Sequence, residues 1–205
     1  MPNWCSNYIE VRGTNSAKIQ ELVKAFNESA LCQAVLPVPE ELLETVAGSH
    51  SDPEAQLLLT AQTQANTEKF GYSNWYDFCT NEWGSKWDIC EAELLHQDED
   101  GLGFTGSFES AWSPPLGVVE ELERQGFQVT LRYYEPGMCY VGMWTAGQDT
   151  YYEYSGIRSD EVRKVIGEDL DDYFGISESL FENEEDEEEL TTWIKEGVEA
   201  REQNL

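Results

Sequence analysis

Apolar residues recur along the first 157 positions with two different periods, which predicts a domain of mixed strands and helices. Every-second-residue spacing, typical of half-buried strands, occurs in residues 4–12, 87–95, 104–110, 127–134 and 139–145, and more weakly in 149–154. Helical spacing occurs in residues 17–27, 75–83 and 116–125.

Capping and stop signals support the three helices. Ser16 can cap the first helix, and Asn74 and Gly84 are placed to begin and end the second. The prolines of WSPPL end a strand and can start the third helix, which Gly126 stops. On a helix over 75–83, three apolar residues four positions apart would form one buried face: Trp75, Cys79 and Trp83.

The order of these elements predicts an α+β fold, a ferredoxin-like β-α-β-β-α-β sandwich with extra strands after the last. Two helices covering one face of an antiparallel sheet explain the alternation in the strands. Residues 48–73 are polar and are interpreted as an insertion, in which 54–63 could be helical. A short helix is expected over 40–46, after two prolines.

The composition changes after Gly156, which divides the chain into a domain of residues 1–157 and an acidic, largely helical extension of residues 158–205. Residues 158–175 have the spacing of an amphipathic helix. The run ENEEDEEE at 182–189 favours an extended or solvated chain because its like charges repel. Apolar residues from Leu190 to Val198 predict a last helix.

Charge excludes one class of partner. The chain holds 41 acidic and 12 basic residues and a net charge of −29, and the division gives −17 for residues 1–157 and −12 for 158–205. Between Lys86 and Arg124 there are ten acidic residues and no Lys or Arg. Because binding to phosphate depends on Lys and Arg, direct contact with nucleic acid or anionic membranes is not expected.

Compartment and cofactors follow from what the sequence lacks. No apolar run approaches the roughly 18 residues of a membrane span, and the first residues do not resemble a signal peptide. The five cysteines are odd in number and form no C-x-x-C pair, so we expect free thiols in a reducing cytoplasm and no metal or other cofactor.

The stretch WYDFCTNEWGSKWD at residues 75–88 has two interpretations. Its rings could stack on bases, but single-strand binders surround such rings with Lys and Arg, and only Lys86 is near. Packing into the core is therefore favoured. The same is expected of Trp4, Trp87 and Trp112, although Trp112 lies beside two prolines and could reach the surface.

No catalytic motif is found, and an enzyme is not predicted. With 41 acidic residues, carboxylate spacing carries no information, and only Glu109 and Glu135 stand out, each at the end of a strand. A turn-stabilising role is favoured for Glu135. His50 and His96 lie in polar segments without a nucleophile motif. The acidic turn DEDG at 98–101 lacks the spacing and distal Glu of a calcium loop.

Four blocks carry a family resemblance: MPNWCSN at the start, WYDFCTNEWGSKWD at 75–88, FESAWSPP at 108–115 and YYEPGMCYVG at 133–142. Together they resemble the YubB-type ferredoxin-like domain family of bacteriophages and conjugative plasmids. The resemblance covers residues 1 to about 155 and implies the ferredoxin-like fold and a mobile-element origin. Similar proteins are encoded on plasmids near anti-restriction functions, but the family implies no reaction and no catalytic residues.

The leading functional hypothesis is a non-enzymatic acidic binding protein that blocks the basic nucleic-acid-binding face of a host restriction, CRISPR or related nuclease. Its partner-contacting residues would be Asp98, Glu99, Asp100, Glu120, Glu121, Glu123, Glu182, Glu184, Glu185, Asp186, Glu187, Glu188 and Glu189. The alternative is a phage accessory protein that binds a host metabolic or transcription factor through an aromatic surface. The charge would then serve solubility.

Overall fold

The computed structural model describes residues 3–202, and for residues 188, 191, 192 and 194–202 it describes the backbone alone. The chain divides into two compact units: the residues up to Gly137 with Met143–Thr150, and Met138–Gly142 with the residues from Tyr151 onward. In the described part of the chain, no helix is long and apolar enough to cross a membrane.

The elements are, in order, β1 (Trp4–Arg12), α1 (Ser16–Asn27), α2 (Leu31–Val35), α3 (Glu40–Leu43), α4 (Pro53–Phe70), α5 (Trp75–Phe78), the π-helical turn η1 (Cys79–Trp83), β2 (Cys90–Gln97), β3 (Gly103–Ala111), α6 (Leu116–Arg124), β4 (Gln128–Glu135), β5 (Tyr140–Thr145), β6 (Gln148–Glu153), α7 (Ser159–Ile166), α8 (Glu168–Phe174) and α9 (Ile176–Glu202).

Six strands form one sheet in the order β2-β3-β1-β4-β5-β6. β1 lies between β3 and β4 and pairs antiparallel with both, so that Ile9 is opposite Gly106 on one side and Leu131 on the other. β2 pairs antiparallel with β3. The α+β class is therefore confirmed, and so is the addition of strands after β4.

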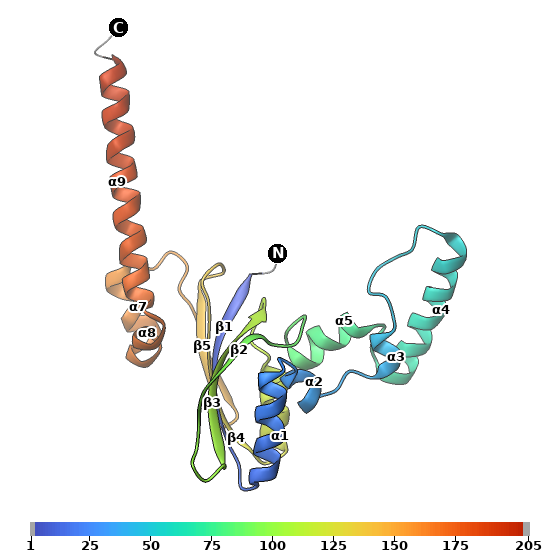
Figure 1. Ribbon diagram of the computed structural model, residues 1–205. Coiled ribbons are helices and arrows are strands. Elements are labelled where there is room, and N and C mark those ends of the chain that lie inside the picture. The colour runs from blue at the N-terminus through green and yellow to red at the C-terminus, as the bar shows by residue number, and fades with distance from the viewer. Residues whose placement is uncertain (1–2, 203–205) are drawn as a thin grey trace. The chain divides into compact units, whose positions relative to one another are not determined.

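The core lies on the sheet face that α1 covers (Figure 1). Along β1 every second residue is buried, from Cys5 to Val11. The ring of Phe26 on α1 lies 5.6 Å from that of Phe104 and 6.0 Å from that of Phe108. A Cβ at Gly106 would come within 2.5 Å of the Phe26 ring, so β3 requires glycine where this ring crosses it.

The first helices follow the sequence pattern with local differences. Asn15, not Ser16, caps α1, because its side-chain oxygen accepts from the amides of Ala17 and Lys18. The insertion holds one long helix, α4, which extends well beyond the expected 54–63. Asp52 caps α4 and Gly71 ends it in the left-handed conformation. The short helix α2 was not predicted.

The segment expected as one helix over 75–83 begins and ends as predicted but divides in the middle. Asn74 caps α5 and Gly84 ends η1 at φ +84°. In η1 the Gly84 amide donates to the Cys79 carbonyl, an i→i+5 bond. Because the wider turn changes the face on which residues fall, Cys79 and Trp83 are buried while Trp75 is only half-buried.

The sequence placed the start of the next strand too early. β2 begins at Cys90, and the residues before it form a loop. In this loop the side chains of Ser85 and Asp88 bond to backbone groups, which competes with strand pairing. Three other predictions of this unit hold: α6 follows the two prolines, Gly126 ends it at φ +93°, and the acidic DEDG turn joins β2 to β3. The short helix expected over 40–46 ends earlier, at Leu43.

The C-terminal unit contains two short helices where one was expected. α7 and α8 are separated by Gly167, whose φ of +89° and ψ of +157° suit glycine alone. Asp171 on α8 is 2% exposed. Its carboxylate accepts from the Ser177 amide at 2.7 Å and hydroxyl at 2.8 Å and lies 3.3 Å from Arg163 Nη1. This carboxylate fixes the start of α9.

The run ENEEDEEE is helical, within α9, and the expected extended chain is wrong. Glu has a high intrinsic helix propensity, which here outweighs the repulsion between neighbouring carboxylates. The last predicted helix is the continuation of α9. Leu190 and Trp193 are exposed, Trp193 by 71%, and the side chains of Ile194 and Val198 lie outside the described residues.

Candidate binding site: the tryptophan pocket

Three tryptophans from separate parts of the first unit are half-exposed. Trp4 starts β1, Trp87 lies in the loop before β2, and Trp112 follows β3; their exposed fractions are 42%, 40% and 42%. The rings of Trp4 and Trp87 lie 6.4 Å apart. The expectation that Trp4 and Trp87 pack in the core is therefore wrong, whereas Trp112 reaches the surface.

The loop that carries Trp87 is tied at both ends. The buried Ser85 donates its hydroxyl to the Trp87 carbonyl at 3.1 Å and lies 3.4 Å from the Ala111 carbonyl at the end of β3. Asp88 accepts from the amides of Cys32 and Gln33, both at 2.9 Å, and so holds the loop against α2. The backbone of the loop between these anchors is thus held in place.

Trp112 is held in a backbone conformation that is unfavourable for its residue type. Its φ is +71°, in the left-handed region, which costs a non-glycine residue roughly 1–2 kcal/mol. Its amide donates to the Asn3 carbonyl at 2.9 Å. Strained residues of this kind concentrate at functional sites.

Lys86 lies among these rings. Its Nζ is 4.3 Å from the centroid of the Trp87 ring, 5.1 Å from that of Trp112 and 5.8 Å from that of Tyr76. Together with Trp75 and Asp77, these four residues line a pocket of about 580 Å³. We call it the tryptophan pocket.

The floor of the pocket is built by α5. Asn74 accepts from the amides of Tyr76 and Asp77 at 2.9 and 3.1 Å and so fixes the first turn. The rings then meet edge to face: Trp75 with Tyr76 at 5.9 Å and Tyr76 with Trp112 at 6.5 Å. Asp77 accepts from the Ser73 hydroxyl, so its carboxylate already has a partner.

A close backbone approach fixes α6 against η1. A Cβ built on Gly117 of α6 would lie 1.8 Å from the Glu82 carbonyl oxygen in η1. Only glycine allows this contact.

Glu109 lies in a neighbouring cavity of about 310 Å³, lined also by Trp4, Ser6, Cys90 and Glu91. Burial raises the pKa of Glu109, and the nearby Glu91 raises it further, while a hydrogen bond from the Ser6 hydroxyl at 2.8 Å opposes the shift. Glu135, the other carboxylate singled out from sequence, is buried and accepts from the Gly137 amide at 3.0 Å. Its turn-stabilising role is confirmed.

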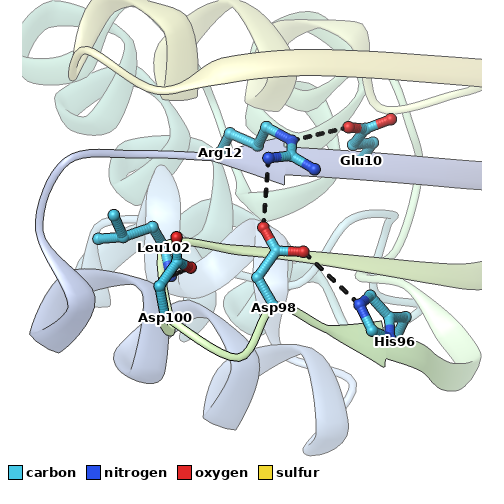
Figure 2. Close-up of polar contacts among 6 residues, drawn as sticks. All are labelled: Glu10, Arg12, His96, Asp98, Asp100 and Leu102. Atoms are coloured by element: carbon cyan, nitrogen blue, oxygen red, sulfur yellow. Dashed lines mark hydrogen bonds and ion pairs between the residues drawn. The ribbon is translucent and has the colours of Figure 1, made fainter.

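Two of the three acidic side chains in the turn at residues 98–100 contact other residues of the protein (Figure 2). Asp98 lies between Arg12, at 3.4 Å, and His96, at 3.6 Å. Asp100 accepts from the Leu102 amide at 2.9 Å. Glu99 is exposed. Of the three predicted contact residues in this turn, two therefore stabilise the hairpin.

The three predicted contact residues on α6 line two different cavities. Glu120 and Glu121 line a cavity of about 260 Å³ with Arg124, which donates to Glu121 at 2.6 and 2.7 Å. The hydrogen bonds from Arg124 lower the pKa of Glu121. Glu123 lines a different cavity, of about 520 Å³, together with Arg12.

The largest set of predicted acidic residues lies on α9. Glu184 accepts from the Ser159 amide at 3.0 Å, which lowers its pKa, and lies 3.3 Å from Arg158. The side chain of Glu188 lies outside the described residues. The others are exposed: Glu182, Glu185, Asp186, Glu187 and Glu189.

Sequence reasoning missed Lys86 as the centre of the aromatic cluster. The signal was present, because Lys86 is the last base before a 37-residue stretch without one and lies next to Trp87. What the sequence could not show is that Trp112, 26 residues away, lies over the same ammonium group.

The described cysteines form no disulfide, and burial raises the pKa of Cys79 to about 12. Burial also raises the pKa values of Cys32 and Cys90. Such thiols are poor nucleophiles at neutral pH. In the described residues, no group of three or more His, Cys, Asp or Glu side chains could hold a metal ion.

Comparison with known proteins gives little. No family model matches the chain, and no curated protein matches it. A crystal structure of a protein api92 from Yersinia pseudotuberculosis, described under the family model DUF1281, is similar over 76% of this chain and 99% of that one. The identity is 11% and the TM-score 0.40, a likeness too distant to support an argument about function.

Proposed function

We propose that this protein is a non-enzymatic binding protein of a bacteriophage or conjugative plasmid, which contacts a host metabolic or transcription factor through the tryptophan pocket. The observation that carries this proposal is the gathering of half-exposed rings from Tyr76, Trp87 and Trp112 around one lysine. Aromatic residues are enriched where binding energy concentrates in protein interfaces.

Two further features support the pocket as a recognition site. Its loop is anchored at Ser85 and Asp88, so little order has to be gained on binding. Trp112 keeps a strained backbone while its ring is only partly buried, a cost that packing alone does not explain.

The test is affinity capture from host lysate with matched tryptophan variants. Trp112→Gly removes a pocket ring and suits the local backbone, and Trp193→Ala removes a more exposed ring on α9. We expect Trp112→Gly to lose the partner, Trp193→Ala to retain it, and moderate salt to leave the complex intact. Retention of the partner by Trp112→Gly would contradict the proposal.

A second candidate is the acidic decoy that occupies the basic face of a host defence nuclease in the cytoplasm. The observation that favours it is the row of exposed carboxylates on α9; among the described residues of this row, Glu184 is half-buried and contacts Arg158 and Ser159. Such an array would steer a basic partner toward this protein.

The structure sharpens the test of this decoy. Neutralising Asp98 would also remove the ion pair with Arg12, so the variant should keep Asp98 and change exposed acids instead. Glu99→Gln combined with amide replacements at 182, 185, 186, 187 and 189 meets this condition. The decoy predicts loss of the nuclease partner and its release at raised salt; unchanged capture would refute it.

We further propose that the first unit is a ferredoxin-like sandwich of the YubB type. The strand order β2-β3-β1-β4, with α1 between β1 and β2 and α6 between β3 and β4, supports this assignment. The division at residues 157 and 158 remains a prediction.

A further inference from the structure

We infer that the tryptophan pocket binds a small molecule that joins a planar ring to one anionic group. This inference goes beyond the proposed function, because its ligand is a small molecule and not a host protein, but it rests on the same pocket.

In the described part of the chain, the ammonium group of Lys86 has no carboxylate partner. The chain has 41 acidic and 12 basic residues, yet the described residues place no carboxylate within 4.0 Å of Lys86 Nζ. Its contacts are with ring faces at 4.3–5.8 Å. An ammonium offers three donors, and ring faces do not replace a charged acceptor. A half-buried lysine of this kind is suited to an anion that arrives with a ligand.

The rings beside Lys86 are suited to a flat apolar group. Trp87 and Trp112 are each about two-fifths exposed while lining the pocket, so part of each ring is accessible from it. Stacking of a planar ring on an aromatic side chain is worth roughly 5- to 150-fold in affinity. Ring and anion would then be held by adjacent groups of one pocket.

Charge and size restrict the ligand further. Residues 1–157 carry a net charge of −17, so a polyanion is repelled through every one of its charges. A ligand with one anionic group is repelled through that group alone. Salt screens the repulsion from protein charges that lie more than about 8 Å from the group. The pocket volume of about 580 Å³ lies in the range of small-molecule sites. Nucleoside monophosphates and aromatic carboxylates both have the required chemistry.

Isothermal titration calorimetry of the purified full chain tests the inference. The probes are adenosine 5′-monophosphate and indole-3-carboxylate, each paired with its uncharged counterpart, adenosine or indole. We expect at least one anion to bind and its counterpart to bind at least tenfold more weakly. Which anion binds tells a phosphate source from a carboxylate source, and either result supports the inference.

Lysine variants identify the contact. Lys86→Met should weaken binding of the anion at least tenfold, and Lys86→Arg should restore part of it. The control is Lys18→Met, which removes an exposed lysine on α1 and should change nothing. Circular dichroism confirms that each variant is folded.

Three results would overturn the inference: no binding of either anion at 10 mM, equal binding of the neutral counterparts, or binding that Lys86→Met leaves unchanged or strengthens. Because the titration needs no host partner, its outcome is independent of the capture experiment. Loss of small-anion binding with intact, Trp112-dependent capture would leave the proposed function standing.

Discussion

The strained backbone at Trp112 makes a prediction about two substitutions that remove the same ring. Both Trp112→Gly and Trp112→Ala lose the indole contacts, but only glycine relieves the strain at φ +71°. That relief is worth about 1–2 kcal/mol. Glycine also gives the unfolded chain more freedom, which offsets about 0.4–1 kcal/mol. We therefore expect Trp112→Gly to be more stable than Trp112→Ala by roughly 0.5–1 kcal/mol.

The assay is thermal unfolding of the two variants side by side, in which this difference corresponds to roughly 1–4 °C in Tm for a chain of this size. Trp87 provides the matched control. It has a similar exposed fraction and no positive φ, so Trp87→Ala should be more stable than Trp87→Gly. If Trp112→Ala is as stable as Trp112→Gly or more stable, the backbone at Trp112 is not strained.

Three other predictions concern the framework around the site and the C-terminal unit. Gly117→Ala should destabilise the first unit by about 2–3 kcal/mol in denaturant unfolding, because its Cβ would overlap the Glu82 carbonyl, whereas Gly48→Ala, with open space around it, should be nearly neutral. Asp171→Ala should lower the free energy of unfolding of the C-terminal unit by about 2–3 kcal/mol, because the hydrogen bonds to Ser177 and Arg163 are lost. Asp172 is exposed, so Asp172→Ala should lower it much less. Equal effects of the two variants would contradict the capping role of Asp171. Because burial raises the pKa of Glu109, its contribution to stability is fully present below the unfolded pKa of about 4.3 and is lost as pH rises through the folded value. Glu109→Gln should therefore gain stability relative to the parent protein between pH 4 and 7, and a pH-independent difference would be inconsistent with this burial.

Local signals account for much of the fold. The prolines before α6, Gly126 after it and the alternation in β4 are visible in the sequence because each acts on its own segment. β2 began later than predicted because Ser85 and Asp88 bond to backbone groups that the sequence pattern does not identify. The acidic run in α9 was misjudged because charge repulsion was weighed without the helix propensity of Glu.

The candidate site was less accessible to sequence reasoning. Tryptophan is a residue type that is usually well buried, so the sequence favours the core for each of the three. Whether each is in fact buried depends on which strands are neighbours. The pairing of β1 with β3 brings Trp4 opposite Ala111, next to Trp112, and nothing in the local pattern of either segment predicts it. Likewise, the contacts of Asp98 with Arg12 and His96 make a predicted binding residue a structural one.

Site-specific photo-crosslinking in host cells tests whether the tryptophan pocket is the recognition surface. Trp87→p-benzoylphenylalanine places the photoreactive group at the pocket, and the same replacement at Trp193 places it on α9. We expect a crosslinked host protein from position 87 and none from position 193. A crosslink from position 193 without one from position 87 would contradict this expectation and would favour the acidic helix as the binding surface.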